Sequence, residues 1–127
     1  MHSVISIGHD IVEIERIKRT VQKYGEKFLQ KVYVPEELHY CLKKSNPFPS
    51  LAARFAAKEA TAKAFACGIG VQFSWQSASI INRLNGSPEV RLDALGLKLL
   101  SLVGGSKVIL SLTHTHTIAS AVIAVVQ

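Results

Sequence analysis

Residues 51–66 constrain the fold more than any other stretch, because their small side chains recur at helical spacing. On a helix with about 100° between successive residues, the alanines occupy one continuous arc. They are Ala53, Ala56, Ala57, Ala60 and Ala64. A stripe of methyl groups lets another element approach closely. We therefore predict a helix from about Leu51 to Gly68 whose alanine face is tightly packed.

Two charged side chains lie just outside this stripe, and two explanations for them remain open. Glu59 and Lys63 are one helical turn apart, so they suit an exposed ion pair worth about 0.2–0.5 kcal/mol. Alternatively Glu59 is functional and needs a second acid, because one carboxylate seldom holds a metal, whereas two can hold Mg2+. Asp10 is a candidate for that acid, although it also suits a turn or the start of a helix.

Apolar spacing and end residues predict three further helices. They cover residues 13–24, ended by Gly25, residues 35–42, begun by Pro35, and a segment from Asp93 to Gly104. The first of them carries a basic stripe of Arg16, Arg19 and Lys23. Taken alone, such a stripe is typical of an ordinary solvated helix face.

The remaining segments predict strands. Residues 4–7 predict a short strand that ends at Gly8 in a tight bend, and Asn85-Gly86 predicts a hairpin between residues 77–84 and 89–92. The runs 107–113 and 118–126 predict two buried strands joined around residues 114–117. This order of strands and helices predicts an α+β fold with an antiparallel sheet packed against helices.

The composition is that of one folded domain covering residues 1–127. The chain is 48% hydrophobic and 19% charged, and its net charge of +6 favours a polyanionic partner without identifying its class. Two cysteines without metal-ligand spacing favour a reducing compartment. The chain shows neither a leader pattern nor a long uncharged apolar run, so we expect a cytoplasmic protein that does not enter a membrane.

Two other motifs leave their role open. His114 and His116 alternate along a predicted strand, which suits either a metal pair or two polar residues at a strand end, and no third ligand stands at a suitable spacing. Gly68 and Gly70 follow a helix C-terminus instead of preceding an N-terminus. Their simplest role is therefore to stop the helix, because phosphate is usually bound at helix starts.

Three stretches together resemble the holo-acyl-carrier-protein synthase family, the small bacterial 4'-phosphopantetheinyl transferases. They are "IGHDIVEIERI" at 7–17, "RFAAKEATAKAFACGIG" at 54–70 and "LSLTHTHTIASAVI" at 110–123. The hairpin sequence "NGSPEV" at 85–90 also fits this family. The resemblance spans nearly the whole chain, and it implies the 4'-phosphopantetheinyl transferase fold.

The resemblance also implies a reaction. The family transfers the 4'-phosphopantetheine arm of coenzyme A to a serine of apo acyl carrier protein and releases adenosine 3',5'-bisphosphate, for fatty acid synthesis. Its Mg2+ is held by an aspartate and a glutamate that match Asp10 and Glu59. The family further implies a homotrimer with active sites between neighbouring subunits.

Further roles follow from the same resemblance. Lys63 would contact coenzyme A and neutralise or protonate the departing phosphate. Because the serine hydroxyl must lose its proton as it attacks, our own hypothesis for the base is Glu59 or a metal-bound water that Glu59 orients. His114 would contact the coenzyme A phosphates, and the loop containing Gly68 and Gly70 would line the nucleotide site. His116 remains unassigned.

The resemblance also implies a binding partner for the basic stripe. Acyl carrier proteins are strongly acidic, and the family's docking surface includes the position of Arg16. We therefore expect Arg16, Arg19 and Lys23 to dock an acidic carrier protein.

The chain departs from the family at a few positions. His9 replaces a small or apolar residue, residues 66–67 replace glycine and threonine, and residues 31–33 depart from an arginine-containing segment.

Two rival functions are a nucleic-acid-binding module and a Mg2+-dependent hydrolase. The basic residues follow no recognition-helix pattern and the few aromatics form no stacking motif, so we expect no nucleic-acid partner.

Overall fold

The computed structural model describes residues 3–127. Within that range the chain forms, in order, β1 (Val4–Glu13), α1 (Ile14–Tyr24), α2 (Glu26–Val32), α3 (Pro35–Leu42), α4 (Phe48–Ala64), β2 (Ala78–Asn82), β3 (Pro88–Leu92), α5 (Ala94–Leu102), β4 (Lys107–His114) and β5 (Ile118–Val126). None of the helices in this range is both long and apolar enough to cross a lipid bilayer.

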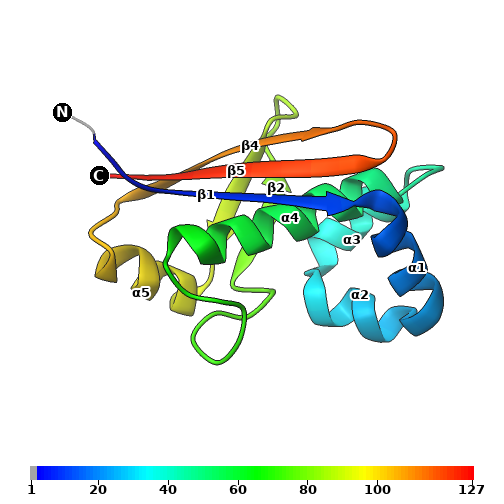
Figure 1. Ribbon diagram of the computed structural model, residues 1–127, viewed down its shortest axis with the longest axis horizontal. Helices are drawn as coiled ribbons and strands as arrows, with labels where there is room; N and C mark the ends of the chain where they lie inside the picture. The colour runs from blue at the N-terminus through cyan, green and yellow to red at the C-terminus, as the bar shows by residue number, and fades with distance from the viewer. Residues whose placement is uncertain (1–2) are drawn as a thin grey trace.

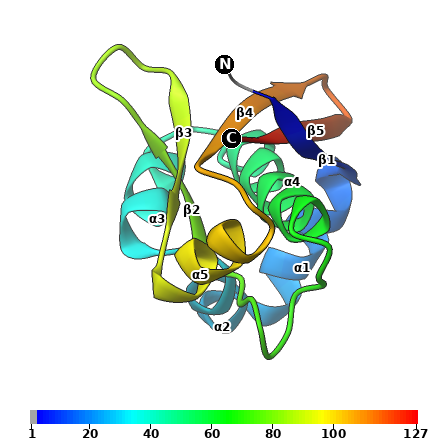
Figure 2. The ribbon, with the colours of Figure 1, turned by 90° about the vertical axis from the view of Figure 1, so that its left-hand side faces the viewer.

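The strands form two antiparallel units. One is a three-stranded sheet in the order β1-β5-β4, and the other is the β2-β3 hairpin. Helix α4 lies between them and contacts β1, β5 and β2 (Figures 1 and 2). Helices α1, α2 and α3 gather at one end of the molecule and α5 lies at the other (Figure 1). The prediction of an α+β fold with an antiparallel sheet is confirmed.

The alanine stripe is the contact face of α4, as predicted. Its alanines are all buried, and so are Ala121 and Ile123 of β5, one of the strands against which α4 packs. Gly8 of β1 completes this contact, because a Cβ atom at position 8 would overlap the carbonyl oxygen of Ala60. The methyl groups on α4 and the absent side chain of Gly8 on β1 therefore set how closely α4 approaches the sheet.

The predicted end of the first strand at Gly8 was wrong. The strand continues to Glu13, Gly8 pairs with Ile123, and Asp10 pairs with Ala121. We expected a glycine here because its backbone allows a tight bend. Instead, its lack of a side chain allows α4 to approach closely. The consequence is that Asp10 is held on a paired strand instead of a turn.

Helix α4 begins at Phe48 and ends at Ala64, earlier at both ends than predicted. Pro49 did not delay its start, since proline is tolerated in the first turn of a helix. Helix α2 was not predicted; Gly25, with a φ of 57°, turns the chain from α1 into it. The Asp93 cap of α5 is confirmed, because its Oδ1 accepts a 2.9 Å hydrogen bond from the Gly96 N–H.

A candidate metal and phosphate site

Asp10 and Lys63 meet where β1 crosses α4. The Lys63 Nζ donates to Asp10 Oδ1 at 3.0 Å and to the carbonyl oxygen of His9 at 3.1 Å. The side chain of Asp10 is 17% exposed and that of Lys63 is 54% exposed. Lys63 therefore joins two elements instead of forming the exposed pair with Glu59 that helix spacing alone suggested; among residues 3–127, Glu59 forms no ion pair with it.

Glu59 is half-buried and lies within electrostatic reach of Asp10. Burial raises the pKa of the Glu59 carboxyl above its ordinary value, and the negative charge of Asp10 raises it further. Lys63 and Arg16 act in the opposite direction on this pKa. Lys63 bonds to Asp10, and Glu59 lies one turn before Lys63 on α4, so the fold places these two carboxylates, nearly fifty positions apart in the sequence, at the same crossing of β1 and α4.

This donor set fits Mg2+. Two carboxylates that repel each other gain from a cation between them, and Mg2+ is usually held by one or two carboxylates together with waters and substrate phosphates. Within residues 3–127, no group of three or more His, Cys, Asp and Glu side chains is placed to hold a metal ion. A cation held by Asp10 and Glu59 would therefore take its other ligands from water or from a phosphorylated substrate.

Arg16 lies closer to this site than the sequence indicated. Its guanidinium carbon is 5.9 Å from the centroid of the Phe55 ring, and Phe55 precedes Glu59 by one turn of α4. The same guanidinium counteracts the rise in the pKa of Glu59. The signal that could have revealed this was the short spacing from Asp10 to Arg16, since α1 begins directly where β1 ends.

His114 does not join these residues within one chain. It is exposed at the end of β4 and pairs with Ala119, whereas Asp10 pairs with Ala121 two positions along β5. From strand spacing and rise, the Cα atoms of His114 and Asp10 are about 12 Å apart. His116 lies beyond the strand in the turn to β5, so the expected alternation of two histidines on one strand was wrong.

Gly68 and Gly70 lie in the exposed loop after α4. A Cβ atom at either position would meet nothing within 4 Å, so neither glycine is required by close packing in this chain. Arg19 and Lys23 are exposed on α1, with the Lys23 ammonium 5.2 Å from the centroid of the Tyr24 ring. The role of the Gly68–Gly70 loop at the nucleotide site therefore stays a prediction. The docking role of the basic stripe stays a prediction as well.

Comparison with known proteins gives this geometry a family. The family described as the 4'-phosphopantetheinyl transferase superfamily matches residues 6–126. The chain belongs to this superfamily. It is 42% identical over 117 residues to the holo-[acyl-carrier-protein] synthase of Protochlamydia amoebophila, covering 92% of this chain and 93% of that protein. The synthase of Chloroherpeton thalassium is 44% identical over 121 residues and is covered to 95%.

Solved structures of the superfamily share the fold. The holo-[acyl-carrier-protein] synthase of Neisseria meningitidis aligns with a TM-score of 0.88 at 35% identity, covering 97% of this chain and 98% of that one. The Helicobacter pylori synthase, solved in complex with coenzyme A, aligns with a TM-score of 0.83 at 32% identity, covering 94% and 98%. The predicted resemblance, the fold and the assignment to the phosphopantetheinyl transferase enzymes are confirmed.

Proposed function

We propose that this enzyme transfers the 4'-phosphopantetheine arm of coenzyme A to a serine of an apo acyl carrier protein. The relatives are named for making the holo form of that carrier, and the Helicobacter pylori structure contains coenzyme A. In the balanced reaction, a serine oxygen bonds to the phosphorus of the arm while the bond from that phosphorus to the adenosine phosphate breaks. The products are the modified serine, adenosine 3',5'-bisphosphate and a proton.

The observation that carries this proposal is the meeting of Asp10 and Glu59 beside Lys63. We infer that the two carboxylates hold Mg2+. When bound there, the ion would offset the charge of the diphosphate and stabilise the departing phosphate. The place of Asp10 on a paired strand and that of Glu59 on the packed helix α4 support this role, because both positions hold the backbone still.

Lys63 and Glu59 supply the remaining chemistry in this proposal. The Lys63 ammonium is more than half exposed on a flexible stem, so it can leave Asp10 for an oxygen of the departing phosphate and neutralise or protonate it. The raised pKa of Glu59 makes its carboxylate a stronger proton acceptor than an exposed glutamate, which suits a base for the serine hydroxyl.

We also propose that the enzyme is a homotrimer with active sites between subunits. All helices of the described chain lie on one side of the three-stranded sheet (Figure 2). The opposite face carries exposed apolar side chains: Ile7 (65% exposed), Ile11 (59%), Ile109 (49%) and Val122 (43%). Exposed apolar side chains gathered on one face are typical of interaction surfaces. Asp10 faces α4 from the edge strand β1, so a neighbouring subunit would have to extend past this edge to bring its His114 to coenzyme A phosphates at Asp10 and Glu59.

The basic stripe supports a docking surface for the acidic carrier protein. Arg16, Arg19 and Lys23 are all exposed on α1, and Arg16 also lies beside the proposed site. A carrier docked on α1 would therefore hold its serine near Glu59. Complementary charge would mainly raise the association rate.

The test is incubation with coenzyme A, Mg2+ and an apo carrier protein, followed by mass spectrometry of the carrier. Transfer adds the mass of the phosphopantetheine arm to the carrier and depends on Mg2+. A hydrolase would release the arm free in solution, and a binding module would leave both substrates unchanged. Either of the last two results would contradict the proposal.

A further inference from the structure

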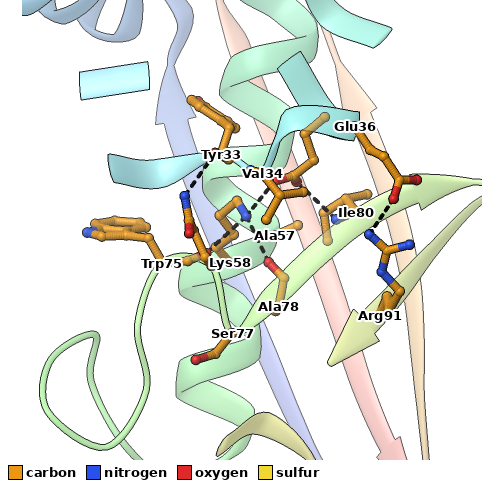
Figure 3. Close-up of polar contacts among 12 residues, drawn as sticks. Tyr33, Val34, Glu36, Ala57, Lys58, Trp75, Ser77, Ala78, Ile80 and Arg91 are labelled. Carbon is orange, nitrogen blue, oxygen red and sulfur yellow. Dashed lines mark hydrogen bonds and ion pairs between the residues drawn. The ribbon is translucent and has the colours of Figure 1, made fainter. Parts of the chain in front are cut away.

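Helix α4 carries a second cation, Lys58, in an entirely different environment. Its side chain is completely buried, and its ammonium donates to Glu37 Oε1 at 2.8 Å, to the carbonyl oxygen of Ala78 at 2.8 Å and to that of Trp75 at 3.0 Å. Figure 3 shows the Lys58 ammonium reaching toward Trp75 and Ala78. An ammonium has three hydrogens to donate, so Lys58 has no bonding capacity left.

Its partner Glu37 is equally occupied. Beside the bond from Lys58, Glu37 Oε1 accepts a hydrogen bond from the Val34 N–H at 3.0 Å, and its Oε2 accepts one from the Ile80 N–H at 2.9 Å. Two side chains therefore connect four segments of the fold: the start of α3, the middle of α4, the end of the loop after α4, and β2.

Stability alone does not explain a pair of this kind. Burial lowers the pKa of Lys58, and the carboxylate of Glu37 only opposes that effect. Removing two charges from water is costly, and replacing a buried ion pair by apolar side chains of similar volume is often neutral or stabilising. What apolar side chains cannot supply is direction, because their contacts tolerate small shifts that hydrogen bonds do not.

Directional contacts between α4 and the three-stranded sheet are confined to the C-terminal end of the helix, where Ser6 and Lys63 form the hydrogen bonds. Before that end, the contact consists of alanine methyl groups, which offer few protrusions to resist rotation or sliding of the helix. Toward β2, Arg54 adds one hydrogen bond, to Asn82. The Lys58 bonds fix α4 from the side of β2, opposite the close contact between Gly8 and Ala60. Since Glu59 follows Lys58 directly in the chain, any rotation of α4 at Lys58 moves the Glu59 carboxylate relative to Asp10.

We propose that Lys58 and Glu37 are positioning residues, which set the rotation and register of α4 and thereby hold Glu59 against Asp10. This inference rests on the proposed function, in which the latter two carboxylates share Mg2+. Neither positioning residue touches the substrate. A displacement of about 1 Å at a reacting group can cost about 100-fold in rate, so a small gain in rigidity has a large effect.

The test replaces both charges at once, with Lys58→Met and Glu37→Leu in the full chain. We expect a folded protein with a melting temperature close to that of the wild type, by circular dichroism. We also expect Mg2+ binding, measured by calorimetry without coenzyme A, to weaken about tenfold, and kcat to fall about 10–100-fold with KM for the carrier protein unchanged. The matched control, Arg91→Met with Glu36→Gln, removes an exposed pair that also joins α3 to the hairpin and should change neither quantity.

The outcomes separate this inference from the proposed function. If the wild type neither binds Mg2+ nor transfers the arm, the proposed function fails first. If the wild type does both and the double variant matches it within about twofold while remaining folded, positioning is overturned. If the double variant does not fold, Glu37→Gln decides by the same measurements, since it keeps the shape of the side chain: weaker Mg2+ binding supports positioning, and unchanged binding overturns it. Failure of that variant to fold would also overturn it, by making the pair a requirement for folding itself.

Discussion

Lys63 and Lys58 lie five residues apart on α4, yet water reaches one of their ion pairs and is excluded from the other. Lys63 and Asp10 are joined at 3.0 Å with side chains 54% and 17% exposed, whereas Lys58 and Glu37 are joined at 2.8 Å with neither side chain exposed. An exposed pair can exchange partners at little cost. The buried ammonium of Lys58 cannot exchange partners in this way, because all three of its hydrogens are already bonded. The helix therefore carries one cation suited to move during a reaction and one suited to stay in place.

The largest expected effect comes from the two acids proposed to hold Mg2+. Asp10→Ala and Glu59→Gln should each lower kcat/KM for transfer by about 10³-fold, because each removes a proposed ligand of the cation that stabilises the departing phosphate. Glu13→Gln is the control and should retain activity, because Glu13 is exposed at the end of β1, the strand that carries Asp10. Near-normal transfer by either acid variant would remove the assignment.

The two lysines should separate in a stability measurement. Lys58→Ala leaves the Glu37 carboxylate buried without its cation, so we expect the free energy of unfolding to fall by about 3–5 kcal/mol. Lys63→Ala should change it by only about 0–1 kcal/mol while lowering kcat. Urea denaturation of both variants measures the contrast. Equal losses of stability would show that exposure does not distinguish the two pairs.

Gly8→Ala tests the close approach between β1 and α4. The added methyl group must displace the backbone at Ala60, so we expect a loss of about 1–3 kcal/mol in unfolding free energy. The same displacement should separate Asp10 from Glu59 and weaken Mg2+ binding, which calorimetry detects. A variant with wild-type stability and wild-type Mg2+ affinity would show that β1 and α4 can accept a methyl group between them, and it would contradict the close contact.

Charge reversal on α1 should have a smaller effect. Arg19→Glu should raise KM for the carrier protein about fivefold at low salt and leave kcat unchanged, and salt should reduce the difference. Arg16→Glu should raise KM and also lower kcat, because Arg16 lies against Phe55, one turn before Glu59 on α4. Lys98→Glu on α5, at the other end of the molecule, is the control. Unchanged saturation curves for both α1 variants would contradict a docking role.

The smallest effect concerns pH. Because the pKa of Glu59 is raised in the folded protein, the folded state binds this proton more tightly than the unfolded state does. Stability from Glu59 is therefore present at pH values below its unfolded pKa and is lost as the pH rises through its folded pKa. Denaturation at pH 4 and pH 7 should show Glu59→Gln gaining stability relative to the wild type at the higher pH only. A gain of equal size at both pH values would contradict the raised pKa.

The sequence predicted most of what depends on local pattern. The alanine face of α4, the Asn85-Gly86 hairpin and the Asp93 cap each follow from neighbouring residues, and each is present in the structure. The pairing of Asp10 with Glu59 was one of several open possibilities until two motifs resembled one family. Neither residue alone distinguished a metal ligand from an ordinary polar residue.

The missed features depend on tertiary contact. In the sequence, Glu37 is one of two acids in the first turn of α3, where acids are common, and Lys58 is one of several charged residues of α4. Their burial arises because α3 and β2 close over α4, and no local pattern reveals a pair separated by 21 positions. Gly8 misled for a related reason: the lack of a side chain served a neighbouring helix, not a turn in its own backbone.

The alanine stripe on α4 has a consequence for how the molecule tolerates change. A methyl group has no rotamers, so these positions give up almost no side-chain entropy when the chain folds. They also leave no side chain that could bend aside to admit a larger neighbour, because the surface facing the sheet is little more than backbone. Selection from a randomised library at these positions for soluble, folded protein should therefore return mainly alanine, with glycine and serine as the rare exceptions.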